Sequence, residues 1–299
     1  MSPEPCKVPD SHAPYVVHGV GVDKMAVFHP PLNPLPSREG SCCYFHGSRV
    51  SNPSCKIYLG FGAWNLGFLC IELIMEKRGY ILDLGLMDYE KAWDLQHHLW
   101  ARRVEGQVPN LLLLLEHPHV ITLGRRGNRS HLIISPEILE AMRIPIFHVE
   151  RGGDVTYHGP GQMVVYPILD LKDYGYRLIR YVDQLEEVIL RVLKDFGIEG
   201  RKDPSNRGVW VNGDKIASIG VAIKRWVSFH GFSLNYETDL KYFDLINPCG
   251  LVGKKMTTMA KILRTKISRE RLVERISFHF KHIFERDWEE KNLEELLAD

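Results

Sequence analysis

One segment of the sequence gathers several side chains that could do chemistry. Residues 151–162 read RGGDVTYHGPGQ, and their four glycines let the backbone approach a ligand closely and offer amide hydrogens as donors. The spacing fits neither a P-loop nor a dinucleotide-binding fingerprint. Glycines in a loop usually serve only a turn, and one histidine such as His158 is more often structural. The density of Arg, Asp, Thr, Tyr, His and Gln in a single connection favours a binding site.

A second candidate is a cysteine held in a tight turn. Cys249 lies in the sequence Asn-Pro-Cys-Gly and is the only cysteine after position 70. The flanking proline and glycine would hold its sulfur at a loop tip, where it could act as a nucleophile if a neighbouring group lowers the pKa of the thiol. The alternative is a small buried apolar residue, the usual role of a cysteine. No CxxC motif occurs, which argues against a zinc ribbon or a thioredoxin-type site.

A third candidate, Lys215, begins the apolar run KIASIG (215–220) shortly after Asn212-Gly213. This dipeptide suits a type I′ turn and predicts a hairpin with strands at 208–211 and 215–223. A lysine at the start of such a strand is usually solvated.

The regular elements that must position these residues begin at Tyr80. Alternation and apolar runs predict strands at 80–87, 111–115, 120–123, 146–149, 163–171 and 229–235. Helices are predicted after Asp88, after Ser135, over 176–196 and over 268–284. The 176–196 helix carries one apolar stripe, which includes Leu178 and Ile179 and is typical of a helix packed on a core. Helices mixed with hairpin-linked strands predict an α+β fold.

The first 79 residues differ from the rest, because they hold nine of the 17 prolines and few charges. We interpret residues 1–79 as a poorly ordered, non-catalytic extension and residues 80–299 as the catalytic domain. The apolar run 57–75 is interrupted by glycines and is marginal for a membrane span. Residues 1–56 lack the Arg-rich, acid-free character of a transit peptide. An alternative is that Met75 is the true start of the protein.

The overall charge excludes one class of function. Lys plus Arg number 38 and Asp plus Glu 37, for a net charge of +1, so no basic excess exists to hold nucleic acid by bulk charge. A local basic patch remains possible, and Gly124-Arg125-Arg126-Gly127 is a basic loop.

Five separated blocks together resemble the lipoyl(octanoyl) transferase family, in order and in spacing. They are EHPHVITLGRRG (116–127), RGGDVTYHGPGQ (151–162), KIASIG (215–220), HGFSLN (230–235) and NPCG (247–250). The resemblance runs from Tyr80 to the C-terminus and does not include residues 1–79. It implies an α+β domain with a mixed, largely antiparallel sheet flanked by helices, similar to the catalytic domain of lipoate and biotin protein ligases.

The resemblance also implies roles for particular residues. Cys249 would be the nucleophile, and Lys215 would activate it, either as a base or by stabilising the thiolate as an ammonium. The residues implied in acyl-chain binding are Arg151, Gly152, Gly153, Asp154, Val155, Thr156, Tyr157, His158, Ser218, Ile219, Gly220, Gly231, Phe232 and Ser233. We expect the glycines at 152, 153, 220 and 231 to keep an apolar slot open for the chain.

The implied reaction moves an octanoyl (or lipoyl) group from the phosphopantetheine of acyl carrier protein to a lysine of a lipoyl domain. The acceptors would be 2-oxoacid dehydrogenases and the glycine cleavage H protein, and the step would begin endogenous protein lipoylation. The group would pass through a thioester on Cys249, with no cofactor, ATP or metal. Neither nucleic acid nor a membrane is expected as a partner. The expected location is cytoplasmic, or organellar if the N-terminal extension is a transit segment.

Two other functions fit parts of the pattern. An ATP-dependent lipoate or biotin ligase of similar fold would need no cysteine, so Cys249 and Lys215 argue against it. A non-catalytic carrier- or lipid-binding protein would keep only the pocket. Dependence on ATP would distinguish the first alternative, and acylation of Cys249 seen by intact mass would distinguish the second.

Overall fold

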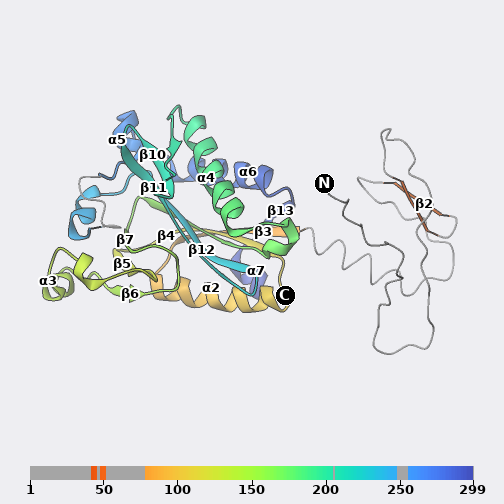
Figure 1. Ribbon diagram of the computed structural model, residues 1–299, viewed down its shortest axis with the longest axis horizontal. Coiled ribbons are helices and arrows are strands. Elements are labelled where there is room, and N and C mark those ends of the chain that lie inside the picture. The colour runs from red at the N-terminus through yellow and green to blue at the C-terminus, as the bar shows by residue number, and fades with distance from the viewer. Residues whose placement is uncertain (1–41, 46–47, 52–77, 205, 248–254, 299) are drawn as a thin grey trace, which may run out of the picture. The chain divides into compact units, whose positions relative to one another are not determined.

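The computed structural model describes residues 42–45, 48–51, 78–204, 206–247 and 255–298 (Figure 1). The chain divides into two compact units, residues 1–63 and 64–299. In the first unit the described residues form one antiparallel hairpin of β1 (Cys42–Phe45) and β2 (Ser48–Ser51). Most of the predicted extension 1–79 therefore lies outside the described residues.

The second unit is built on an eight-stranded sheet with the order β13-β3-β4-β8-β12-β11-β10-β9. β3 pairs in parallel with both β13 and β4, and the other neighbours are antiparallel. The strands are β3 (Arg78–Leu86), β4 (Asn110–Glu116), β8 (Gln162–Ile168), β9 (Arg201–Lys202), β10 (Gly208–Val211), β11 (Asp214–Lys224), β12 (Val227–Asn235) and β13 (Asp287–Glu290). The predicted mixed, largely antiparallel sheet is confirmed.

A second, three-stranded sheet carries the glycine-rich segment. β5 (Val120–Leu123) lies between β6 (Ile146–His148), which is parallel to it, and β7 (Val155–His158), which is antiparallel. The second half of the predicted glycine-rich connection is thus a strand. Its register pairs Val120 with His158 and Leu123 with Val155, which fixes the chain on both sides of the turn at 151–154.

Helices cover both faces of the large sheet (Figure 1). α4 (Leu178–Asp195) and α6 (Arg269–Ile283) pack on one face, and α2 (Tyr89–Val104) and α7 (Leu293–Ala298) on the other. The shorter helices are α3 (Pro136–Ala141) and α5 (Met259–Leu263). Among the described helices, none is long and apolar enough to cross a membrane.

The apolar run of β4 shows why the sheet is buried on both sides. Leu112 and Leu114 belong to the core under α4 and α6, whereas Leu111, Leu113 and Leu115 belong to the core under α2. All five side chains are at most 1% exposed. Burying one leucine contributes about 1.5–3 kcal/mol, so this strand needs no polar alternation.

The predicted helices form, with one difference at the start of α4. Asp88 caps α2 by accepting from the amides of Glu90 and Lys91, and Ser268 caps α6. Leu178 and Ile179, which the apolar stripe of α4 includes, are 53% and 66% exposed. They lie on the first turn of the helix and line an open groove instead of the core.

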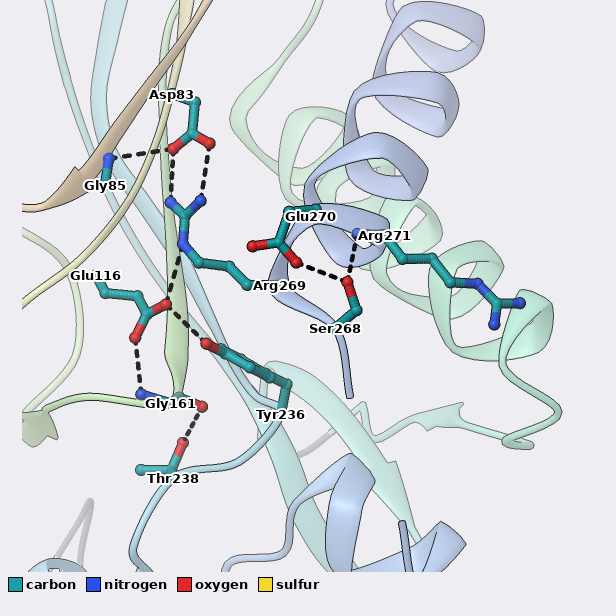
Figure 2. Close-up of polar contacts among 10 residues, drawn as sticks. All are labelled: Asp83, Gly85, Glu116, Gly161, Tyr236, Thr238, Ser268, Arg269, Glu270 and Arg271. Atoms are coloured by element: carbon teal, nitrogen blue, oxygen red, sulfur yellow. Dashed lines mark hydrogen bonds and ion pairs between the residues drawn. The ribbon is translucent and has the colours of Figure 1, made fainter. Parts of the chain in front are cut away.

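An ion-pair network ties α6 to β3 and β4 of the sheet (Figure 2). The guanidinium of Arg269 donates to both carboxylate oxygens of Asp83 on β3, at 2.5 and 2.8 Å, and to Oε1 of Glu116 on β4, at 3.1 Å. Glu116 also accepts from the hydroxyl of Tyr236 at 2.7 Å and from the amide of Gly161 at 2.8 Å. The network therefore positions the turn that precedes β8, next to the histidine that ends β7.

Removing Arg269 should test how much this network stabilises the fold. Arg269→Ala leaves two carboxylates without their cation and should lower the free energy of unfolding at neutral pH by about 1–2 kcal/mol, because the pair is partly exposed. Lys266→Ala, which removes an exposed cation with no partner among the described residues, should change it by less than about 0.5 kcal/mol. Chemical denaturation measures both.

The effect of Arg269→Ala should also depend on pH. Burial raises the pKa of Asp83, but hydrogen bonds from Arg269 and Gly85 and the charge of Arg269 together lower it below its usual value. A carboxyl group whose pKa is lower in the folded than in the unfolded state contributes its full stabilisation above the pKa of the unfolded state. That stabilisation is lost as the pH falls through the pKa of the folded state. The difference between wild type and variant should therefore shrink below about pH 4. A difference that stays constant down to acid unfolding would contradict this assignment.

Candidate active site

The turn at 151–154 is fixed by bonds to both sheets. The amide of Gly152 donates to the carbonyl of Val221 on β11, at 2.9 Å. The carbonyls of Arg151, Gly153 and Asp154 accept from the amides of residues 125, 126 and 124, each at 3.0 Å. The turn therefore closes the gap between the small sheet and the large one.

The side chain of Arg151 is part of this closure. Its guanidinium is buried and donates to the carbonyl and the hydroxyl of Thr122 at 2.7 and 2.8 Å. Gly153 has a φ of +89°, a conformation that favours glycine.

A cavity opens beside this turn, lined by the turn and β7 and by residues of β8, β12 and β11 of the large sheet. Lys215 lines it, and so does every residue of the predicted acyl-binding set except Tyr157: Arg151, Gly152, Gly153, Asp154, Val155, Thr156, His158, Ser218, Ile219, Gly220, Gly231, Phe232 and Ser233. Residues from three separated blocks of the sequence thus meet at one cavity.

Tyr157 lies on the opposite face of β7 from Thr156 and His158. It is fully buried, stacks on Tyr242 with 5.1 Å between ring centroids, and its hydroxyl is hydrogen-bonded to Nδ1 of His119 at 2.7 Å. The alternation of a strand explains why a run of neighbouring residues cannot all face one ligand. Tyr157 is placed to pack the small sheet.

Lys215 is buried, unlike a typical lysine at the start of a strand. Its Nζ donates to Oδ1 of Asn206 at 2.6 Å and lies 5.3 Å from the centroid of the Trp210 ring, where a cation is favoured. Its backbone is bonded on both sides to the segment 255–257, because its amide donates to the carbonyl of Lys255 and its carbonyl accepts from the amide of Thr257, each at 2.9 Å.

Cys249 lies outside the described residues, but the chain on either side of residues 248–254 is fixed near the cavity. On one side the amide of Asn247 donates to the carbonyl of His131 at 2.8 Å. On the other side Lys255 bonds to Lys215. The His131 imidazole lies 2.6 Å from the buried carboxylate of Asp154, whose second oxygen has no donor among the described residues.

The histidine at the end of β7 is held in one neutral form. Nδ1 of His158 lies 2.6 Å from Oε1 of Gln162, whose amide nitrogen donates to Asn235 and to the carbonyl of Tyr157. Oε1 is therefore an acceptor, and Nδ1 of His158 must carry the proton. Burial, with the neighbouring charge of His117, lowers the pKa of His158 to about 3. Its Nε2 is left as a hydrogen-bond acceptor.

A carboxylate stands directly before the turn. Glu150 contacts His230 at 3.5 Å, His97 at 3.2 Å and the indole of Trp93 at 3.1 Å. The contact with His230 lowers the pKa of Glu150 to about 2, against the opposing effect of burial, with help from Trp93 and His97. Burial lowers the pKa of His230. Burial therefore favours the neutral form of both histidines at the cavity, where Arg151, Asp154, Lys215 and Lys255 also lie.

Sequence reasoning missed several residues of the cavity wall. His230 lies inside the block HGFSLN, and Val164 and Tyr166 are alternate residues of a predicted strand, so a stricter use of strand alternation points to them. No sequence signal marks Tyr89 or Phe243. The cavity residues outside the predicted set and Lys215 are Tyr89, Val164, Tyr166, Trp210, His230, Phe243, Lys255 and Met256.

Gly220 and Gly231 line the cavity, and the close approach of neighbouring backbone is a second reason for glycine at both positions. A Cβ at Gly231 would collide with the carbonyl oxygen of Val165 on β8. A Cβ at Gly220 would lie 3.0 Å from both Cδ of Arg151 and the carbonyl oxygen of Gly152. Both glycines let two backbones approach, so they also help to hold the cavity walls together.

The comparisons with known proteins agree with this geometry. Residues 88–281 match the lipoyl protein ligase A/B catalytic domain family. An octanoyltransferase from Syntrophobacter fumaroxidans is 55% identical over 224 residues, which cover 75% of this chain and 98% of that protein. The octanoyltransferase of Solibacter usitatus is 50% identical over 202 residues, covering 68% and 91%. The chain belongs to the octanoyltransferase family.

Solved structures share the fold of this octanoyltransferase family member at low sequence identity. Lipoate-protein ligase A bound with ATP superposes with a TM-score of 0.60 at 14% identity, covering 75% of this chain and 93% of that one. A bipartite lipoate protein ligase from Thermoplasma acidophilum gives 0.56 at 14% identity, covering 75% and 91%. The resemblance of the sequence to lipoyl(octanoyl) transferases, and the fold that it implies, are confirmed.

The assignment of Gly231 can be tested by adding one methyl group. Gly231→Ala should lower the free energy of unfolding by about 1–3 kcal/mol or more, because the new Cβ must displace the β8 backbone. Gly152→Ala is the matched control, since its Cβ would lie 3.5 Å from the carbonyl oxygen of Val221, an ordinary contact. Thermal unfolding followed by circular dichroism compares them. Equal midpoints for the two variants would overturn the close-approach explanation.

The neutral state of His158 predicts an invariant signal. In long-range ¹⁵N spectra its Nδ1 should be protonated and its Nε2 unprotonated throughout about pH 5–8, because its lowered pKa lies below that range. Gln162→Leu removes the acceptor of the Nδ1 proton, so the two tautomers should then mix. A His158 that titrates near neutral pH in the wild type would contradict the assignment.

Proposed function

We propose that this acyltransferase takes an octanoyl or lipoyl group from the phosphopantetheine of acyl carrier protein and passes it to a lysine of a lipoyl domain, with Cys249 as the intermediate carrier. The observation that supports this most is the buried Lys215 beside the cavity, bonded to the chain that returns from residues 248–254. The acceptors would be the lipoyl domains of 2-oxoacid dehydrogenases and the glycine cleavage H protein.

The cavity wall suits an acyl chain that ends in a polar head. Val155, Val164, Phe232, Phe243 and Met256 supply apolar surface, and each buried methylene of a chain contributes about 0.8 kcal/mol. The polar side, with Lys215, lies next to the turn at 151–154. We place the carbonyl of the thioester at this polar side and the end of the chain among the apolar residues.

In the first step the thiolate of Cys249 attacks the carbonyl carbon of the donor thioester. A new carbon–sulfur bond forms, the bond to the pantetheine sulfur breaks, and pantetheine leaves as a thiolate that takes a proton from solvent. The exchange is nearly isoenergetic, because one thioester replaces another. As an ammonium, Lys215 would stabilise the Cys249 thiolate, and the two groups would titrate as a unit.

In the second step a neutral lysine amine of the acceptor attacks the acyl-enzyme. The amide bond forms, the Cys249 sulfur leaves as the thiolate, and the proton of the amine passes to solvent or to the departing sulfur. Nε2 of His158 can accept a hydrogen bond from the amine, but its low pKa makes it a poor store for the proton. Forming an amide from a thioester is favourable, so we propose that neither ATP nor a metal is needed.

The alternative is ATP-dependent activation of a free acid, as the shared fold with a ligase that binds ATP allows. Two observations favour transfer: the high identity to octanoyltransferases, and Cys249, a cysteine that a ligase would not need, with the buried Lys215 as its proposed partner. We also propose that residues 1–79 are non-catalytic, and that the reaction takes place in the cytoplasm, as the similarity to bacterial enzymes suggests.

Acyl-enzyme formation tests this proposal. Incubation with octanoyl-carrier protein, without ATP, should add one octanoyl group at Cys249, seen by intact mass and peptide mapping. Cys249→Ser should lose nearly all transfer, whereas Cys6→Ser, outside the family match, should keep it. An octanoyl group on a different residue, or a requirement for ATP, would contradict the mechanism.

The role of Lys215 has its own signature. Lys215→Ala should slow acylation, and raising the pH should restore part of the rate, because hydroxide then ionises the thiol without help. Lys215→Arg should not restore base chemistry, since arginine stays protonated. An unchanged pH profile for iodoacetamide alkylation of Cys249 in Lys215→Ala would count against activation.

A further inference from the structure

A groove runs outward from the cavity along β11 and the start of α4. It shares Gly152, Gly153, Asp154, Lys215, Ile219 and Gly220 with the cavity wall. Its other lining residues are Arg125, Arg126, His131, Leu178, Ile179, Val182, Asn206, Arg207, Val221 and Ile223. A molecule in the groove can therefore continue into the cavity beside Lys215.

One part of the groove is apolar without being core. Ile219, Val221 and Ile223 are alternate residues on one face of β11, and all three are only partly buried. Opposite them, Leu178 and Ile179 are more than half exposed on the first turn of α4. An uncharged, mostly apolar ligand would cover these side chains and gain from their burial.

Two arginines stand on the wall beside the turn. Arg125 and Arg126 are exposed, and their backbone is fixed by the bonds to the carbonyls of Arg151 and Gly153. Nε of Arg125 donates to the carbonyl of Glu150, whereas the guanidinium of Arg126 has no partner among the described residues. Guanidinium groups with open donors, carried on a fixed backbone, are suited to a phosphate.

Other polar side chains of the groove already have partners, and Lys215 lies at its inner end, where it also lines the cavity. Arg207 on the opposite wall contacts the carboxylates of Asp183 and Glu186. Asp154 is paired with His131. At the outer part of the groove, away from Lys215, Arg125 and Arg126 are therefore the arginines without a carboxylate partner among the described residues.

We propose that this groove binds the phosphopantetheine arm of the acyl donor. The amide-linked pantetheine chain lies on Ile219, Val221, Ile223 and the first turn of α4, and its phosphate is bound by Arg125 and Arg126. The inference rests on the proposed function, because it takes the donor to be an acyl thioester. The shared chemistry is phosphopantetheine, which a carrier protein and a coenzyme A thioester both present.

Binding of two unreactive analogues tests the arm site without any chemistry. S-octyl phosphopantetheine and S-octyl pantetheine differ only in the phosphate, and calorimetry on the wild type gives a Kd for each. The phosphate should tighten binding about tenfold, as expected for a charge-assisted hydrogen bond. In Arg125→Ala/Arg126→Ala the ratio of the two Kd values should fall to about one. Lys266→Ala, which removes an exposed cation that lines neither cavity nor groove, should keep the wild-type ratio.

The apolar wall of the groove is tested by a separate substitution. Ile179→Ser should weaken binding of both analogues by the same severalfold factor, because it changes the chain contact and not the phosphate contact. Equal Kd values for the two analogues in the wild type, or a phosphate preference that survives the double arginine substitution, would overturn the proposal.

Two octanoyl donors show whether the arm can come from carrier protein, from coenzyme A or from both. They also test the groove independently of the proposed function. The double substitution should slow acylation of Cys249 by octanoyl-carrier protein and by octanoyl-coenzyme A alike. A loss confined to the carrier protein, with unchanged analogue binding, would replace the arm site by a protein contact. If the analogues bind as expected but no donor acylates Cys249, the groove stands and the proposed thioester mechanism falls.

Discussion

The site depends on one set of backbone hydrogen bonds, those that hold the turn at 151–154 between two sheets. The amide of Gly152 reaches β11, and three carbonyls of the turn receive the amides that follow β5. Without these bonds the small sheet would have no fixed position relative to Lys215, and the cavity would have no wall. The left-handed Gly153 and the missing Cβ at Gly220 are consequences of the same close approach.

Desolvation then decides which groups at the cavity are charged. Buried imidazoles such as His158 stay neutral and serve as hydrogen-bond partners, because charging them would cost more than their contacts return. Lys215 keeps polar and aromatic partners in Asn206 and Trp210, which suit a cation. In the proposed thioester exchange, an ammonium at Lys215 would stabilise negative charge on the reacting sulfur, and neutral histidines would not compete for that charge.

Much of the fold and part of the site could be predicted from the sequence, for different reasons. α2 and α6 carry capping residues and apolar stripes, and β4 is apolar on both faces, so local physics alone is sufficient. The sequence motifs identified most of the cavity residues, because each motif supplies several neighbouring residues to the cavity wall. Tyr157 shows the limit of that reasoning, because strand alternation directs it away from its neighbours.

Other features depend on partners that no local pattern names. Glycine is required at position 231 because the carbonyl oxygen of Val165 lies where a Cβ would be. The tautomer of His158 is set by the side-chain amide of Gln162, which also contacts Asn235 on β12 and the carbonyl of Tyr157 on β7. The apolar stripe of α4 did not predict that Leu178 and Ile179 are exposed. The stripe continues to the start of the helix, but the hydrophobic core does not extend that far. The parallel pairing of β3 with β13 joins segments about two hundred residues apart, beyond the reach of periodicity.

That last pairing has a consequence for how the molecule is made. β3 is the first strand of the large sheet to leave the ribosome, yet its neighbour β13 and its ionic partner Arg269 are among the last segments synthesised. During translation the edge of β3 therefore lacks β13, and the carboxylate of Asp83 lacks its cation Arg269, until almost the whole chain is made. A nascent chain that stops short of α6 would present an open sheet edge to its surroundings, so chaperone capture and aggregation compete with folding until the C-terminus arrives.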